Sequence, residues 1–220
     1  MECKNCECDE AKIEQRLLYL RQAMRLALLT VAWNTFEGLA ALILAFIASS
    51  VALCGFGLDS LIETLSAIVV AWRFMSESKT TSLIDQQRLE KSAARCIGSL
   101  LLILALYIAF DSLRHLLFSS EHARESWFGV ALAMCALIVM PLLSRAKYKT
   151  ADALGSTALK ADAFQSLTCA WLAGTTLLGL MLNASFGWSW ADPTAALLFV
   201  PAIIREGLAA FKGDLCQDCH

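Results

Sequence analysis

The sequence contains few charged residues for its length. Only 17% of its 220 residues are Asp, Glu, Lys or Arg, whereas 58% are hydrophobic and the mean hydropathy is +0.59. A soluble domain is usually about half apolar and about a quarter charged. The composition therefore disfavours a soluble protein and leaves little of the chain to form a soluble domain. The net charge of −2 is in itself uninformative, and we expect no nucleic-acid partner.

The apolar residues fall in blocks of about 20, which is the length a helix needs to cross a bilayer. The six blocks are Met24–Ile47, Val51–Trp72, Cys96–Phe118, Trp127–Leu143, Thr157–Asn183 and Ala191–Phe211. A chain inside a bilayer must satisfy its backbone hydrogen bonds internally, so these blocks should be helices. The charged segment before the first block is not the short basic start of a cleavable signal peptide. The sequence predicts an all-α, polytopic membrane protein with six transmembrane helices.

The predicted spans divide the chain into three parts. Residues 1–23 form an N-terminal segment, residues 24–211 a transmembrane domain, and residues 212–220 a tail. If the helices alternate in direction, all of the 18 Lys and Arg residues except Arg114 and Arg124 fall on one side. Because basic residues favour the cytoplasmic side, we expect both termini in the cytoplasm and the helices in the plasma membrane.

Two acidic residues lie inside the second block, GFGLDSLIETLSAIVVAWR. Asp59 and Glu63 are one helical turn apart and should project from the same face. A charge at the bilayer centre costs at least about 2.5 kcal/mol, and adjacent carboxylates repel each other. A cation between them removes that cost, and no basic residue lies in the middle of a predicted span. We interpret the pair as half of a cation site, the alternative being a carboxylate hydrogen-bonded to a neighbouring helix.

A second polar stripe lies in the fifth block, ALKADAFQSLTCAW. Asp162, Gln165 and Cys169 are spaced i, i+3, i+7 and should share a face. Alone, Gln165 could link helices and Cys169 could fill space. Together with Asp59 and Glu63 they would supply two carboxylates, an amide oxygen and a thiolate, enough for a four-coordinate ion such as zinc. The thiolate would make the site softer and more tolerant of cadmium or mercury.

A third intramembrane acid, Glu37, lies in the first block, three residues after Asn34. It could carry protons, act as an outer ligand, or face the entry to the site, and the sequence does not choose among these roles. Asp162 is a second candidate for an accessory or proton-coupling role.

Two segments carry a resemblance to a known family. LDSLIE resembles the second-helix motif of the cation diffusion facilitator family, an acidic residue followed four positions on by another. ALKADAFQSLTCA resembles its fifth-helix motif, in which Ala-Asp is followed by a His and then an Asp. The resemblance covers about residues 24 to 211 and implies the family's transmembrane domain, with Asp59 and Glu63 as metal ligands. Gln165 stands in the place of the His and Cys169 in the place of the Asp, which points to a divergent branch.

The resemblance implies an exporter of divalent or soft heavy-metal cations rather than an enzyme. Zinc is the expected ion, with cadmium or mercury as alternatives, and no tightly bound cofactor is expected. Because metal ligands must be deprotonated, we expect proton-coupled alternating access. Most family members carry a cytoplasmic domain after the sixth helix, but only residues 212–220 follow Phe211 here. A homodimer would therefore rest on the membrane helices.

Cysteines are concentrated at the two ends of the chain. Cys3, Cys6 and Cys8 lie in CKNCEC, and Cys216, Cys219 and His220 lie in CQDCH. Cys-x-x-Cys is a common half-site for zinc or softer metals, so we interpret both tails as metal-capture sites. The alternatives are incidental cysteines in disordered tails, a membrane thiol-disulfide redox protein that uses these pairs, and a metal-responsive membrane adaptor without flux.

Overall fold

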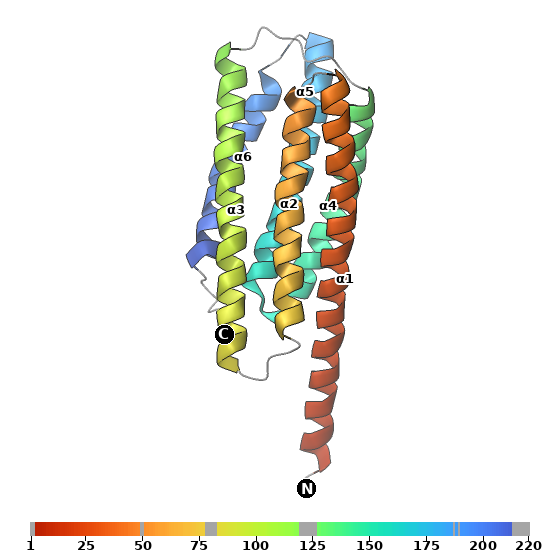
Figure 1. The fold of residues 1–220 in the computed structure, drawn as a ribbon, viewed down its shortest axis with the longest axis vertical. Helices are drawn as coiled ribbons and strands as arrows, with labels where there is room; N and C mark the ends of the chain where they lie inside the picture. The colour runs from red at the N-terminus through yellow and green to blue at the C-terminus, as the bar shows by residue number, and fades with distance from the viewer. Residues whose placement is uncertain are drawn as a thin grey trace.

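The chain forms an elongated bundle of long helices (Figure 1). The computed structural model describes residues 3–48, 51–77, 83–118, 127–186, 188 and 190–212, and these contain six helices and no strand. The helices are α1 (Cys3–Ala48), α2 (Val51–Glu77), α3 (Leu83–Phe118), α4 (Trp127–Leu154), α5 (Thr157–Phe186) and α6 (Ala191–Lys212). Successive helices alternate in direction, so α6 runs toward the end of the bundle at which α1 begins. The predicted all-α fold with six helices is confirmed.

Large apolar side chains cover much of the outer surface of the bundle. Phe46, Leu106 and Leu198 are 90%, 72% and 76% exposed, whereas many charged side chains lie inside. Within the described residues, five helical segments are long and apolar enough to cross a membrane: Glu14–Leu44, Gly55–Glu77, Ile84–Leu117, Val130–Leu154 and Pro193–Lys212. This arrangement is that of an integral membrane protein, as the sequence predicted.

The most extensive helix contacts pair α1 with α2, α3 with α6, and α4 with α5. Between α1 and α2 the approach is close, because a Cβ atom on Gly57 would lie 2.7 Å from Cγ of Leu42 and 3.3 Å from the carbonyl oxygen of Gly38. Small residues at such points let helix backbones approach in a membrane. Contacts of α2 with α5 and of α1 with α4 complete the centre of the bundle. The helices that carry the predicted polar faces therefore meet there.

The helices run further than the apolar blocks predicted. The fourth span was expected to end at Leu143, but α4 continues to Leu154. In this extension Ser144 and Lys147 are buried while Arg145 and Lys149 are exposed, so the helical period of the buried face continues through a charged segment. The block boundaries left Lys147 between the fourth and fifth spans, which is wrong because it lies within α4. A basic residue is buried inside the bundle.

A two-residue turn joins α4 to α5. Gly155 adopts a φ of 64°, a conformation that favours glycine, and the Ser156 N–H donates to the carbonyl of Ala151 at 3.0 Å. The hydroxyl of Ser156 accepts a hydrogen bond from the Leu159 N–H at 3.2 Å and so caps α5. Because the turn is tight, α4 and α5 are antiparallel neighbours. This places Lys147 opposite the polar stripe of α5.

Candidate metal site

Three acidic side chains from two helices lie buried near the middle of the bundle. Glu37 of α1 and Glu63 of α2 are 0% exposed, and Asp59 of α2 is 4% exposed. The charges of Asp59 and Glu63 act on Glu37, and that of Glu63 acts on Asp59, so the three carboxyl groups share one region between α1 and α2. Burying like charges together is costly unless something compensates them.

Most oxygens of these acids have no hydrogen-bond partner. Both carboxylate oxygens of Glu37, Oδ1 of Asp59 and Oε2 of Glu63 are buried and unpaired. The amide groups of Asn34 and Gln165 are also unpaired, and their side chains are 1% and 0% exposed. Buried polar atoms are almost always paired in native proteins. Buried carboxylate and amide oxygens that lack hydrogen-bond partners are suitable ligands for a cation.

Cys169 joins this region from α5. Its side chain is 1% exposed, its thiol faces the Asp59 carboxyl group, and the charges of Glu63 and Glu37 also act on it. It packs as well against a small apolar cluster that includes Met140 of α4. The structure therefore places Cys169 beside both acids of α2, with Gln165 one turn earlier on the same helix.

The predicted ligands lie in the same region, but they do not yet surround a common point. Within the described part of the chain, no three His, Cys, Asp or Glu side chains already meet in the arrangement that holds a metal ion. Binding an ion would require the other ligand side chains to move closer to Glu63. The charge of the ion would favour this movement because it offsets the repulsion between the carboxylates.

A buried lysine and two serines complete the polar interior. The ammonium of Lys147 pairs with Oδ2 of Asp162 at 2.8 Å and donates to Oγ of Ser166 at 2.8 Å. Ser166 donates to Oε1 of Glu63 at 2.5 Å, and Ser66 donates to Oδ1 of Asp162 at 2.7 Å. All five residues are fully buried. Both oxygens of Asp162 thus have partners, unlike those of Glu37, and the accessory or proton-coupling roles of the two acids stay predictions.

Sequence reasoning missed Lys147 and Ser166. Lys147 stands in a charged run that ends an apolar block, although its helical spacing from Met140 and Ser144, both buried, marks it as inward-facing. Ser166 lies one turn after Asp162 on the polar face of α5, but its bond to Glu63 depends on how α5 packs against α2. Only the tertiary structure shows that contact.

Comparison with known proteins agrees with this architecture. The family model described as the cation efflux transmembrane domain matches residues 27–215. This chain belongs to the cation efflux family. The resemblance to the cation diffusion facilitators is thereby confirmed.

Three proteins whose names describe transporters or antiporters are similar to this cation efflux protein. It is 26% identical over 154 residues to an uncharacterized transporter of Synechocystis sp., covering 69% of this chain and 49% of the relative. It is 22% identical over 156 residues to a cadmium, cobalt and zinc/H(+)-K(+) antiporter of Bacillus subtilis, with 71% and 49% covered. An antiporter of the same name from Bacillus velezensis is 22% identical over 173 residues, with 77% and 55% covered. The chain spans about half the length of these curated relatives.

The tail residues of this cation efflux protein cannot be placed against the site. Cys3, Cys6 and Cys8 belong to the first turns of α1, but their side chains lie outside the described residues, as do Cys216, Cys219 and His220. Metal capture by the tails stays a prediction.

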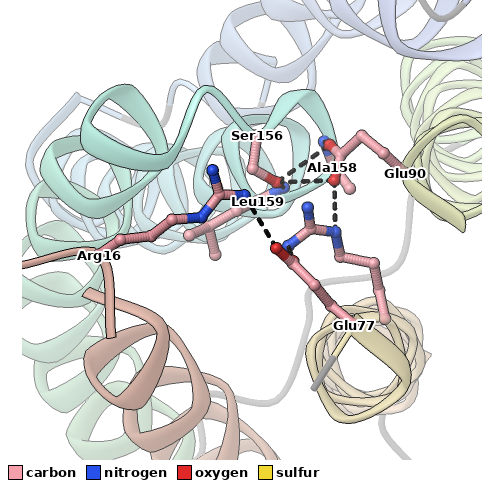
Figure 2. A network of polar contacts seen from close by, with 7 residues as sticks. Arg16, Glu77, Glu90, Ser156, Ala158 and Leu159 are labelled. Carbon is pink, nitrogen blue, oxygen red and sulfur yellow. Dashed lines mark hydrogen bonds and ion pairs between the residues drawn. The ribbon is translucent and has the colours of Figure 1, made fainter. Parts of the chain in front are cut away.

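A second group of buried charges ties three helices together at the end where α4 turns into α5 (Figure 2). Arg73 of α2 pairs with Glu77 at 2.8 Å and with Glu90 of α3 at 2.5 Å. Arg16 of α1 reaches the same Glu77 at 3.0 Å. Arg73 lies ten residues after Glu63, about 15 Å further along the helix. The network is therefore separate from the cluster of acids.

Glu90 extends this network to α5. Its Oε1 accepts hydrogen bonds from the Ser156 hydroxyl at 3.0 Å and from the Ala158 N–H at 2.8 Å, as Figure 2 shows. A carboxylate at a helix N-terminus satisfies free backbone N–H groups and interacts favourably with the helix dipole. This end of the bundle is thus closed by bonds among α1, α2, α3 and α5.

Proposed function

We propose that the chain is a secondary transporter that carries divalent or soft heavy-metal cations out of the cytoplasm, and that it is not an enzyme. One observation above all supports this: carboxylate oxygens of Glu37, Asp59 and Glu63 are buried without partners in one region of a membrane bundle. Uncompensated acids at this depth are costly and usually mark an ion pathway. Membership of the cation efflux family points the same way.

The proposed ligands are Asp59 and Glu63 of α2 with Gln165 and Cys169 of α5, and Glu37 is near enough to the α2 acids to join them. Two carboxylates, an amide oxygen and a thiolate suit zinc. The thiolate also tolerates cadmium or mercury. Zinc is the ion we expect first, and the names of the two Bacillus relatives include cadmium, cobalt and zinc.

Proton coupling follows from the chemistry of the ligands. Carboxylates and a thiol bind a metal only when deprotonated, so loading an ion releases protons and unloading it takes them up. Glu37 is the acid best placed to exchange protons, because both of its oxygens are free of hydrogen bonds. Helix groups would rock around the site to give alternating access. When the transporter opens at the end of the bundle where Arg73 and Glu90 lie, the ion pair between these two residues would have to separate.

The membrane orientation is part of the same proposal. Arg16, Arg73 and Lys147 lie toward the end of the bundle that the distribution of basic residues assigns to the cytoplasm. We propose a plasma-membrane protein with both termini in the cytoplasm and a homodimer formed by the membrane helices. Its partners would then be the bilayer, metal cations and protons.

Proteoliposomes test the function. The purified chain is reconstituted, and uptake of Zn²⁺, Cd²⁺, Hg²⁺ and Cu⁺ is followed under a fixed pH gradient for the native chain and for Asp59→Ala, with Ser144→Ala as a buried control. We expect zinc flux in the native chain and the control, and none in Asp59→Ala although it remains folded. Native flux in Asp59→Ala would reject the proposed site.

The same vesicles separate the alternatives. A membrane thiol-disulfide protein would keep its activity in Asp59→Ala and lose it when the tail cysteines are replaced. A metal-responsive adaptor would bind metal at its tails and show no flux in any variant.

A further inference from the structure

A series of hydrogen bonds leads from α4 through α5 to a carboxylate of the proposed metal site. Lys147 contacts Ser166 at 2.8 Å, and Ser166 contacts Oε1 of Glu63 at 2.5 Å. All three side chains are 0% exposed. Buried groups linked in this way hold one another in fixed positions.

The donors and acceptors fix the direction of this series. The ammonium of Lys147 can only donate, so Ser166 accepts from it. The single hydroxyl proton of Ser166 is then available for Glu63, which accepts it at Oε1. The competing acceptor, the backbone carbonyl of Asp162, is 3.4 Å away, a much longer contact. Lys147 is itself anchored, because Asp162 pairs with it and is held in turn by Ser66.

This series of hydrogen bonds leaves the second carboxylate oxygen of Glu63 available for another partner. With Oε1 occupied by Ser166, only Oε2 is free of hydrogen bonds. A carboxylate held in this way offers one oxygen to a cation. Single-oxygen ligation suits a small four-coordinate ion such as Zn²⁺. Larger ions with higher coordination numbers use both oxygens of a carboxylate, as Ca²⁺ does.

We propose that Lys147 and Ser166 are positioning residues that hold Glu63 so that it presents a single oxygen, and that they thereby favour Zn²⁺ over the larger Cd²⁺. This inference rests on the proposed function, because it takes Glu63 as a metal ligand. Neither residue touches the cation. They act on its binding through Glu63, in the way that hydrogen-bond partners of metal ligands generally do.

Equilibrium binding of Zn²⁺ and Cd²⁺ to the full-length chain in detergent tests the proposal. Tail binding is removed by replacing Cys3, Cys6, Cys8, Cys216 and Cys219 with Ser. In this background Ser166→Ala should raise the Zn²⁺ Kd by about 10- to 100-fold, as loss of a hydrogen-bond partner of a metal ligand commonly does. The Cd²⁺ Kd should rise less, because the freed Oε1 can then bind the larger ion. The Zn²⁺/Cd²⁺ preference should therefore fall.

Two controls separate positioning from a merely structural role. Ser144→Ala removes a buried α4–α5 hydrogen bond, from its hydroxyl to the Ala163 carbonyl at 2.8 Å, that does not lead to Glu63. It should leave both Kd values unchanged. Adding Ser166→Ala to Glu63→Gln should weaken Zn²⁺ binding no further than Glu63→Gln does alone, since residues that act through one contact are not additive.

The role of Lys147 is tested by replacing Lys147 and its ion-pair partner Asp162 together. Lys147→Met combined with Asp162→Asn leaves no unpaired charge, and it should raise the Zn²⁺ Kd and lower the Zn²⁺/Cd²⁺ preference as Ser166→Ala does. Native affinity and preference in this double variant would show that Lys147 does not position Glu63.

The remaining outcomes are equally decisive. Native Kd values in Ser166→Ala, an equal effect of Ser144→Ala, or additive losses with Glu63→Gln would each overturn the inference while leaving the proposed function intact. If Glu63→Gln itself bound both ions as the native chain does, Glu63 would not be a ligand, and the proposed site would fail together with the inference.

Discussion

The buried ion pair between Lys147 and Asp162 gives the sharpest prediction about stability. Both side chains are 0% exposed, and their charged atoms are 2.8 Å apart. Lys147→Met keeps a similar length and apolar stem but removes the charge. Asp162 would then be left buried with a hydrogen bond from Ser66 and no cation beside it.

The expected loss is large. Removing one partner of a buried pair costs about 3–5 kcal/mol, because the other charge is left uncompensated. At about 2–4 °C for each kcal/mol in a chain of this size, Tm should fall by about 6–20 °C. Adding Asp162→Asn removes the stranded charge and should recover most of the loss. Lys149→Met, two residues away on the exposed face of α4, should cost no more than about 0.5 kcal/mol.

Thermal unfolding of the purified variants provides the assay. Tryptophan fluorescence is followed in one detergent and at one scan rate, because membrane proteins often unfold irreversibly and Tm then depends on the rate. A Lys147→Met chain that melts with the native protein would refute the reasoning. So would a double variant that is no more stable than Lys147→Met.

Three further predictions concern the bundle ends, the helix contacts and the tails. Glu90→Gln removes the charge that pairs with an arginine on α2, so the free energy of unfolding should fall by about 1.5–3 kcal/mol, and an unchanged melting curve would show that the network adds nothing. Gly57→Val adds a branched side chain where a Cβ would already lie 2.7 Å from Cγ of Leu42. It should cost about 1–3 kcal/mol and reduce the yield of folded protein on size-exclusion chromatography; a native yield would contradict the close approach. Removing Met1–Asp9 and Gly213–His220 should lower zinc flux more at scarce than at saturating zinc, whereas equal losses at both would argue against metal capture.

The number and type of helices could be read from the sequence, but their ends could not. Apolar blocks of bilayer length leave the backbone little choice except helix. The end of α4 was misjudged because a block of apolar residues stops at Leu143 while the helical period does not. Lys147 is buried because it lies on the inward face of that continuing helix, and a count of charged residues cannot show this.

All four proposed ligands were suggested by the sequence, and the two on α2 were the clearest. Asp59 and Glu63 stand out because two acids on one face of an apolar helix are costly unless a cation or a neighbouring helix compensates them. That Glu37 shares their region depends on how α1 packs against α2. The link from Lys147 through Ser166 to Glu63 depends on the packing of α4, α5 and α2. Such contacts join residues that are distant in sequence, so local spacing carries no signal for them.

Zinc binding by the intramembrane acids alone decides whether they form a metal site. The chain with serine at the five tail cysteines is titrated with Zn²⁺ in detergent and compared with the same chain carrying Asp59→Asn and Glu63→Gln. We expect the first chain to bind a single zinc ion and the second, although folded, to bind none at this site. Equal binding by the two chains would contradict this expectation.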